Sequence, residues 1–459
     1  MIWNSRQLEE ALKIRIPLEI RANEVQFNSK DVKLGDLFIA LKGENSDGHL
    51  YAADAINRGA GAVILCKEVQ NLPTEKIIKV LDTMEALNLL AHYKRNKSKA
   101  KFVAITGSVG KTSTKEAVKL MLQPFGKVFA SRGNFNNYLG LPINLASLPD
   151  DVDFAVFELG MNHQGEIREL TKIVKPDIAV ITIISEAHLQ FFNSLNDIAD
   201  AKCEIFEGLV NNGIAIINRD SQSFDRILFN LNKMNIHNIA SFSAIMPSDC
   251  RLELYQKRDK KIYLEYSIKS ERISITLPAL PEHQAKNFAA GFMVVRSFNL
   301  DVTKAAKQLE QFVLTAGRGL IVEANKGAKK YQVICDYYNA SPESLKASLQ
   351  YLKLIEHPKK VAIIGDMREL GETAPKLHHD LVPYIVDAGV SKALLVGENV
   401  KFIEDNLPAT IFTKRFINVD ELISDLANML GDDELILIKG SLGIGLKKVM
   451  EYFDKNKMK

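Results

Sequence analysis

The sequence predicts an α/β protein of several domains, built mainly on parallel sheets. Strand-length apolar runs alternate with helical patterns over most of the chain. A glycine-rich turn carrying a lysine joins one of these strands to the helix that follows. The length of 459 residues also exceeds what a single hydrophobic core usually serves.

The first part of the chain predicts a small mixed α/β domain over residues 1–98. The stretch "GDLFIALKGENSDGHLYAADAINRGAGAVIL" (35–65) is typical of a strand, a turn, a helix, a glycine break and a second strand. The polar stretch "HYKRNKSKAK" (92–101) shows no apolar face, and it therefore predicts a linker.

The middle of the chain predicts a central domain over residues 99–315. The apolar runs expected to be its clearest strands are 102–105, 154–159, 177–184 and 213–218. Helical patterns separate these runs, which favours a largely parallel sheet covered on both faces.

A second alternating block follows "TAGRG" (315–319) and predicts a Rossmann-like domain over residues 316–459. Its expected strands are 331–338, 360–367, 392–398 and 434–440.

Composition excludes several classes of protein. The net charge is +3 and the lysines are scattered, so nucleic-acid binding has little support. The four cysteines are far apart in sequence and form no CxxC pair, which is typical of a reducing cytoplasm without structural zinc. The longest apolar runs have strand length, and the N-terminus lacks a signal-peptide pattern. We therefore expect a cytoplasmic protein with no membrane insertion.

The stretch "AITGSVGKTSTKE" (104–116) predicts a phosphate-binding loop. Gly107 and Gly110 allow a tight turn, the helix expected over 115–122 contributes its dipole, and Lys111 adds a full positive charge. The usual pattern has a further glycine where Ile105 stands, so an ordinary strand-to-helix turn is the alternative. We expect nucleotide phosphates to be bound by Thr106, Gly107, Ser108, Val109, Gly110, Lys111, Thr112 and Ser113.

Residues that follow other strands are further candidates, because ligands sit beyond the carboxyl ends of parallel strands. Glu158 ends an apolar strand and is either a magnesium ligand or an ordinary capping carboxylate. His188 alone is typical of a structural or exposed histidine. Lys202, by its spacing on a predicted helix, is typical of a solvated lysine.

The stretch "GNFNNYLGLP" (133–142) places three asparagines, Asn134, Asn136 and Asn137, between glycines. Their amide groups suit recognition of a polar ligand, and a hydrophilic turn is the equal alternative.

Six segments occur in a characteristic order: "TGSVGKTSTKE", "GNFNNYLGLP", "ELGMNHQGEI", "EAHLQFFNSLNDIADAKCEIF", "DYYNASPES" and "IGDMRELG". With them the chain resembles the Mur ligases of bacterial cell-wall synthesis over essentially its whole length. The resemblance is strongest to the branch that adds D-alanyl-D-alanine to UDP-N-acetylmuramoyl-tripeptide.

The resemblance implies ATP-dependent formation of an amide bond through an acyl phosphate. It implies a UDP-binding N-terminal domain, a central ATPase domain and a C-terminal Rossmann-like domain. The cofactors it implies are ATP and Mg²⁺, and we expect the protein to be a monomer.

The resemblance also implies roles for individual residues. Lys111, Lys202 and His188 would be the catalytic residues, and Lys111 would hold the phosphates. Thr112 and Glu158 would bind a first magnesium ion, and His188 and a carbamylated Lys202 would serve a second. Other implied roles are nucleotide binding by His283, Asn287, Arg318, Asp336 and Asn339, and substrate binding by Ser29, Lys30, Asn134, Asn136 and Asn137.

Three departures from the family motifs affect individual contacts. The uridine-site motif usually reads Asp-Ser-Arg, and here it is Asn28-Ser29-Lys30, which loses the fork geometry of arginine. Leu442 stands where the motif Lys-Gly-Ser-Arg has arginine, and "DSYNANP" has become "DYYNASP".

Two classes of alternative function remain. A sister Mur ligase or a folylpolyglutamate synthase would use the same mechanism, but the Asp-Asn-Pro-Arg string typical of the sister that adds the third residue is absent. A non-catalytic P-loop regulator would bind nucleotide without a second metal, and Glu158, His188 and Lys202 argue against it.

Overall fold

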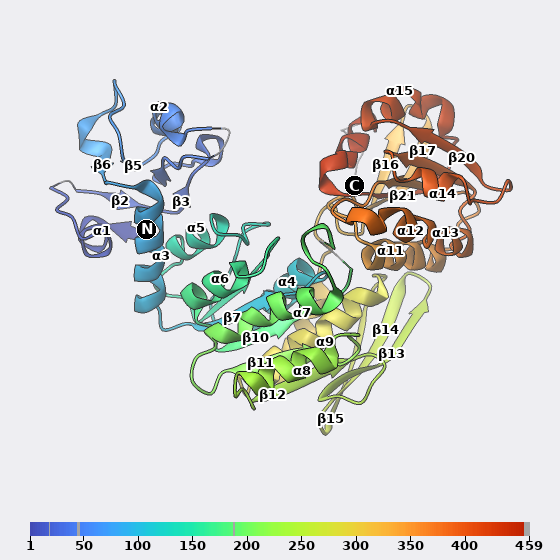
Figure 1. Ribbon diagram of the computed structural model, residues 1–459, viewed down its shortest axis with the longest axis horizontal. Helices are drawn as coiled ribbons and strands as arrows, with labels where there is room; N and C mark the ends of the chain where they lie inside the picture. Colours follow the sequence, from blue (N-terminus) through green and yellow to red (C-terminus); the bar gives the residue numbers. More distant parts are fainter. Residues whose placement is uncertain (18, 44–45, 187–188, 454–459) are drawn as a thin grey trace.

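The structure is a computed structural model that describes residues 1–17, 19–43, 46–186 and 189–453. Three main sheets follow one another along the chain, and each forms the centre of its own lobe (Figure 1). The predicted three-domain α/β architecture is confirmed. Within the described ranges, no helix combines the length and the hydropathy that a membrane span requires.

The N-terminal domain contains a short parallel sheet in the order β3-β4-β5-β6 and a separate antiparallel pair, β1 and β2. The strands are β1 (Trp3–Asn4), β2 (Arg21–Ala22), β3 (Val25–Gln26), β4 (Leu37–Ile39), β5 (Ala62–Leu65) and β6 (Ile77–Lys79). The helices are α1 (Ser5–Leu12), α2 (Ala52–Asn57) and α3 (Thr83–Lys97).

The linker predicted over residues 92–101 is wrong. Helix α3 continues to Lys97, and β7 begins at Lys101. Lys94 is buried, and its ammonium donates hydrogen bonds to the Ile2 carbonyl and to the Asp150 carboxylate, both at 2.6 Å. These partners are distant in sequence, so the local polar pattern could not reveal the buried face of the helix.

The central domain is a nine-stranded sheet in the order β15-β14-β13-β12-β11-β10-β7-β9-β8. The strands from β8 to β13 run parallel, and β13, β14 and β15 form antiparallel pairs at one edge. The strands are β7 (Lys101–Thr106), β8 (Val128–Ala130), β9 (Phe154–Glu158), β10 (Ile178–Ile181), β11 (Ile214–Asn218), β12 (Ile239–Ser243), β13 (Cys250–Arg258), β14 (Lys261–Ile268) and β15 (Glu271–Pro278).

Helices cover both faces of this sheet (Figure 1). Alternate residues of β7 enter opposite cores: Val103 and Ile105 pack with α4 and α9, whereas Phe102 and Ala104 pack with α5 and α6. Burial on both faces explains why these strands are continuous apolar runs. The helices are α4 (Lys111–Leu122), α5 (Gly140–Ala146), α6 (Glu166–Val174), α7 (Leu195–Cys203), α8 (Phe224–Lys233), α9 (Glu282–Ser297) and α10 (Val302–Gln308).

The C-terminal domain is a six-stranded sheet in the order β16-β17-β21-β18-β19-β20, parallel except for the β16–β17 pair. The strands are β16 (Leu320–Lys326), β17 (Lys329–Cys335), β18 (Lys360–Gly365), β19 (Lys392–Val396), β20 (Phe412–Phe416) and β21 (Glu434–Lys439). The helices are α11 (Pro342–Leu354), α12 (Ala374–His379), α13 (Val382–Asp387), α14 (Lys401–Glu404) and α15 (Val419–Met429).

The domains are joined in two different ways. The apolar core of the N-terminal domain continues into the central domain, since Ile143 and Ala146 of α5 belong to the same cluster as Trp3. The Trp3 indole also donates a hydrogen bond to the Ala146 carbonyl at 2.7 Å. The two clusters of the C-terminal sheet are formed by residues of that domain, with Leu189 of the central domain packed at the edge of one.

Candidate active site

The phosphate loop lies at the carboxyl end of β7, between β10 and β9, which is the position where open α/β sheets bind ligands. The helix after it, α4, begins at Lys111, four residues before the start predicted from sequence. Gly110 has φ of 88°, and a Cβ there would lie 2.9 Å from Asn287 Oδ1. Both the conformation and the close approach require glycine.

Lys111 folds back over the loop. Its ammonium donates a hydrogen bond to the Gly107 carbonyl at 2.7 Å. Burial lowers the pKa of Lys111; the Glu158 charge opposes this shift, and Arg318 adds to it. The structure therefore holds a partly buried cation beside the phosphate loop at a helix N-terminus, an arrangement suited to a triphosphate.

Glu158 ends β9 and is 2 % exposed. Its carboxylate accepts hydrogen bonds from the Thr112 hydroxyl at 2.7 Å and from the Asn136 amide at 2.8 Å. The Glu158 backbone N–H donates to Ser131 Oγ at 3.1 Å, which fixes the end of the strand. The structure thus brings together three sequence candidates. The Thr112 hydroxyl and the Glu158 carboxylate offer the hard oxygen donors that magnesium prefers, and the Asn136 amide nitrogen orients the carboxylate.

The start of α9 lies against the phosphate loop. Gln284 donates a hydrogen bond to Ser113 Oγ at 3.1 Å, and its amide nitrogen lies 3.1 Å from His283 Nε2. Burial lowers the pKa of His283 to about 4, so the imidazole is neutral at pH 7. His283 and Asn287 were sequence candidates, but Gln284 was missed because its contact with Ser113 spans 171 residues.

The C-terminal domain contributes a charged pair across the cleft. Lys439, at the end of β21, donates to the Asp336 carboxylate at 2.8 Å and to the Asn339 carbonyl at 3.1 Å. The guanidinium of Arg318 lies 4.1 Å from the centre of the Tyr338 ring. The sequence identified Arg318, Asp336 and Asn339, but it gave no role to Lys439.

These groups line one cleft of about 840 Å³ between the central and C-terminal domains. Residues from the central domain include Ser108, Val109, Gly110, Lys111, Thr112, Ser113, Asn134, Asn136, Glu158 and His283. Residues from the C-terminal domain include Arg318, Asp336, Tyr338, Asn339, Arg368 and Lys439. The site is therefore completed only by two domains together.

Three asparagines of "GNFNNYLGLP" differ in position. Asn134 and Asn136 line the cleft, but Asn137 does not appear among its lining residues. The Asn137 side-chain oxygen accepts hydrogen bonds from the backbone N–H groups of Leu139 and Gly140, at 3.2 and 2.9 Å. Asn137 therefore stabilises the start of α5.

Lys202 is not the solvated lysine that its spacing favours. It lies on α7 and is 1 % exposed, and its side-chain amine makes no hydrogen bond or ion pair with any described residue. Burial lowers the pKa of Lys202 well below its usual value, and the charge of Lys111 adds to the shift. Both effects favour the neutral form of the amine over the ammonium. His188, the other candidate for a second metal, lies outside the described residues.

Ser29 and Lys30 lie in a short 3-10 helix of the N-terminal domain, Ser29–Asp31. Ser29 is buried, whereas Lys30 is exposed. The Asn28 side chain accepts a hydrogen bond from the Lys30 backbone N–H at 3.2 Å. Asparagine and aspartate both serve as such caps, so the departure at Asn28 preserves the local structure.

The fold and the cleft define a three-domain protein whose phosphate-loop motif lies in a cleft between its central and C-terminal domains. Three family profiles match the chain: Mur ligase family, catalytic domain, over residues 21–95; Mur ligase middle domain over 105–295; and Mur ligase, glutamate ligase domain, over 317–442.

Similar proteins agree with these profiles. The UDP-N-acetylmuramoyl-tripeptide–D-alanyl-D-alanine ligase of Rickettsia prowazekii is 52% identical, and the alignment covers 99% of this chain and 100% of that protein. The ligase of the same name from Haemophilus influenzae is 32% identical, with 96% and 95% covered. A crystal structure of MurF from Acinetobacter baumannii has a TM-score of 0.83 and 29% identity, with 98% and 99% covered. The chain belongs to the Mur ligase family.

Proposed function

We propose that this chain uses ATP to join D-alanyl-D-alanine to UDP-N-acetylmuramoyl-tripeptide. The observation that carries the proposal is the cleft itself, in which Lys111 of the central domain faces Asp336 and Lys439 of the C-terminal domain. The full-length relative named for this reaction supports the choice of substrates. A MurF ligase of Thermotoga maritima solved in complex with ADP, with a TM-score of 0.76 and 27% identity, supports ATP as the energy source.

The first step activates the carboxylate of the tripeptide. An amine cannot displace oxide from a carboxylate, so the γ-phosphoryl group is first transferred to a carboxylate oxygen. The bond between the γ-phosphorus and the bridging oxygen breaks, ADP leaves, and an acyl phosphate forms. Lys111 and the loop N–H groups hold the triphosphate in line and stabilise its charge during transfer.

In the second step the neutral amine of D-alanyl-D-alanine attacks the acyl carbon. The new C–N bond forms, the tetrahedral intermediate collapses, and inorganic phosphate leaves with the C–O bond electrons, while the amine releases its proton. Closure of the cleft excludes water, which would otherwise hydrolyse the acyl phosphate.

Thr112 and Glu158 would hold the first magnesium ion, because a hydroxyl and a carboxylate meet there, with the Asn136 amide nitrogen donating a hydrogen bond to the carboxylate. Among the described residues, no cluster of three or more His, Cys, Asp or Glu side chains forms a metal site, so Glu158 is the one carboxylate of this site. A magnesium ion at this position would screen the repulsion between the tripeptide carboxylate and the triphosphate. Lys202, carbamylated, would serve the second ion together with His188.

The remaining assignments belong to the same proposal. The domains span residues 1–98, 99–315 and 316–459, with Ser29 and Lys30 of the first contacting the uridine nucleotide. His283 and Asn287 contact the base of ATP. The protein acts as a monomer, since one chain supplies both walls of the cleft. It acts in the cytoplasm, where ATP and UDP-linked precursors occur.

The assay that tests the function measures ADP release from ATP in the presence of UDP-N-acetylmuramoyl-tripeptide and each candidate amine in turn. We expect turnover to depend on D-alanyl-D-alanine. Turnover with a single amino acid such as diaminopimelate or glutamate, and none with the dipeptide, would identify a sister ligase instead.

Replacing the Glu158 carboxylate is expected to impair magnesium use. Glu158→Gln keeps the shape of the side chain but removes its charge. We expect kcat for ADP release to fall about 100-fold, which is the usual effect of losing one charge-stabilising group at a transferring phosphoryl. The rate of ADP release is measured as a function of magnesium concentration. Glu169→Gln, on the exposed side of α6, is the matched control. An unchanged magnesium dependence in Glu158→Gln would exclude the metal role.

The two domains are expected to close on their ligands. The segment between them contains Gly317 and Gly319, with φ of 78° and 93°. Because glycine has no Cβ, these residues can adopt such angles and can also change them when the domains move. Small-angle X-ray scattering should give a smaller radius of gyration when a non-hydrolysable ATP analogue and UDP-N-acetylmuramoyl-tripeptide are both present. Equal dimensions with and without ligands would contradict closure.

A further inference from the structure

Among the described residues, several cationic side chains line the cleft. They are Lys111, Lys286, Arg318, Lys346, Arg368 and Lys439. All but one of them contact a carboxylate, a carbonyl or an aromatic ring, namely Gly107, Glu282, Tyr338, Glu343 and Asp336. Arg368 is exposed, and its guanidinium makes no ion pair or hydrogen bond with a described residue. It is therefore the cleft cation that these contacts leave available for an anion.

The backbone around Arg368 is fixed on all sides. The Arg368 N–H donates to Ser441 Oγ at 2.8 Å, and the Met367 N–H donates to His378 Nε2 at 3.0 Å. Glu369 has φ of 64°, and its carbonyl accepts a hydrogen bond from the Gln190 N–H at 3.0 Å. A left-handed non-glycine residue costs about 1 kcal/mol or more and persists only where the surroundings impose it. Arg368 thus projects from a rigid, strained turn, as ligand-binding residues commonly do.

The position of the guanidinium is equally defined. A Cβ at Gly443 would lie 2.2 Å from Arg368 Nη1, so the guanidinium rests against the Gly443 backbone. The preceding residue, Leu442, is 57 % exposed and also lines the cleft. Leu442 occupies the position of the missing motif arginine, so Arg368 places a guanidinium beside that position.

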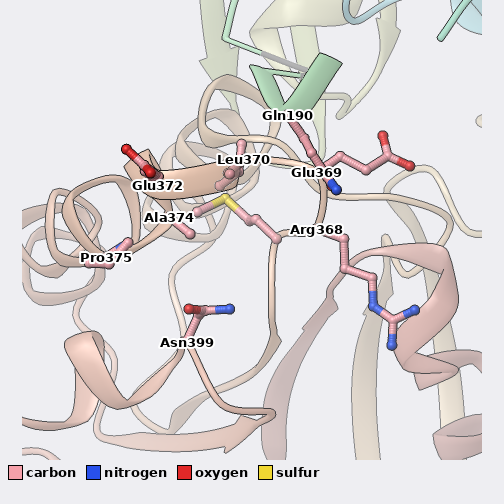
Figure 2. Close-up of a pocket in the computed structure, with 10 residues that line it drawn as sticks. Gln190, Arg368, Glu369, Leu370, Glu372, Ala374, Pro375 and Asn399 are labelled. Carbon is pink, nitrogen blue, oxygen red and sulfur yellow. The ribbon is translucent and has the colours of Figure 1, made fainter. Parts of the chain in front are cut away.

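Arg368 also borders a second pocket, of about 670 Å³, that adjoins the cleft. Figure 2 shows Gln190 of the central domain at the top of this pocket, with Glu372 at the left and Asn399 below. Arg368 and Glu369 extend from the turn on the right, Arg368 downward and Glu369 upward. Arg368, Glu369 and Leu370 line both spaces. The turn is therefore the place where a second ligand could enter beside the nucleotide.

We propose that Arg368 binds the terminal carboxylate of the acceptor dipeptide. This inference rests on the proposed function. At neutral pH the dipeptide carries an amino group at one end, which must reach the acyl phosphate near Lys111, and a carboxylate at the other. Lys111 and the loop N–H groups on the central domain are committed to phosphate. The planar fork of Arg368, on the opposite domain, matches a carboxylate with two parallel hydrogen bonds.

The test compares two acceptors, D-alanyl-D-alanine and its C-terminal amide, D-alanyl-D-alaninamide. For Arg368→Ala we expect KM for D-alanyl-D-alanine to rise about 10- to 100-fold, as for loss of a hydrogen-bonded pair of charges. KM for ATP should not change, and the amide should be used equally well by the parent enzyme and the variant. Arg415→Ala, which removes an exposed arginine paired with Glu404 outside both pockets, is the matched control.

A compensating change sharpens the test. Because Leu442 borders the place of the Arg368 guanidinium, the double variant Arg368→Ala/Leu442→Arg should recover discrimination between acid and amide. A rise in KM for ATP, or an equal loss with acid and amide, would overturn the assignment. If the parent enzyme releases no ADP with any acceptor, the proposed function falls and this inference with it. If the parent enzyme is active with D-alanyl-D-alanine and Arg368→Ala has the same KM for it, the proposed function stands and this inference alone falls.

Discussion

Lys111→Ala is expected to lower kcat/KM for ADP release by about 100-fold or more, because a cation placed in advance at a transferring phosphoryl group is worth several kcal/mol. The Lys111 ammonium is partly buried and directed at the loop carbonyls of Gly107 and Ser108, and the loop holds no other lysine that could replace it. Steady-state kinetics with saturating substrates measure the effect.

The fold should survive this change. Burial lowers the pKa of Lys111, which means that the folded protein holds the charged side chain at a free-energy cost. Its removal should therefore leave the melting temperature unchanged or slightly raised. Lys119→Ala, on the partly exposed face of the same helix, is the matched control and should retain full activity. A Lys111→Ala enzyme with more than a tenth of the parent rate would refute the phosphate-binding role.

Lys202→Ala is expected to be nearly inactive. An ammonium would repel magnesium. The neutral amine would instead add to the carbon of carbon dioxide, forming a C–N bond and releasing one proton, to give a carbamate that offers oxygen ligands with one negative charge. The structure supplies the conditions for that reaction, since Lys202 is 1 % exposed and burial lowers its pKa well below the usual value. Rates of ADP release, with circular dichroism to confirm folding, measure the loss.

Chemical rescue distinguishes a missing carbamate from a damaged core. In Lys202→Ala, formate or acetate can occupy the space of the carbamate, so each should restore part of the activity. In Lys202→Met the side chain fills that space, so neither acid should help. Full activity in Lys202→Ala without any added acid would end the hypothesis.

The pH dependence of recovery has a definite sign. Only the neutral amine takes up carbon dioxide, and a lowered pKa increases the neutral fraction at any pH below the usual lysine value. After carbon dioxide has been removed and returned, activity should recover faster as the pH rises, until the amine is fully neutral. Recovery that slows with rising pH would contradict the carbamate.

Features determined by local sequence were predictable. Strands β7, β9, β10 and β11 lie within or close to the predicted apolar runs, because strands buried on both faces need such runs. The phosphate loop was recognisable because its glycines and lysine serve one local geometry. Helix α3 was not, since the burial of Lys94 depends on Ile2 and Asp150, which are distant in sequence.

The same division applies to the site. The resemblance to the Mur ligases implied the pairing of Glu158 with Thr112, whereas the position of Glu158 at a strand end left a capping role open. Lys439 could not, because only the folded C-terminal sheet brings it to Asp336, 103 residues away. Arg368 was visible only as part of a motif string. Only the folded cleft shows that its guanidinium packs against Gly443 and forms no ion pair with a described residue.

The continuous core between the N-terminal and central domains has a thermodynamic consequence. Because α5 shares one apolar cluster with Trp3, we expect these two domains to unfold as one cooperative unit and the C-terminal domain, with clusters of its own, to unfold as a second. Heating should then give two transitions, so that no single melting temperature describes the whole molecule. A ligand that bridges the cleft binds only when both units are folded, so by mass action it couples the two transitions and draws them together.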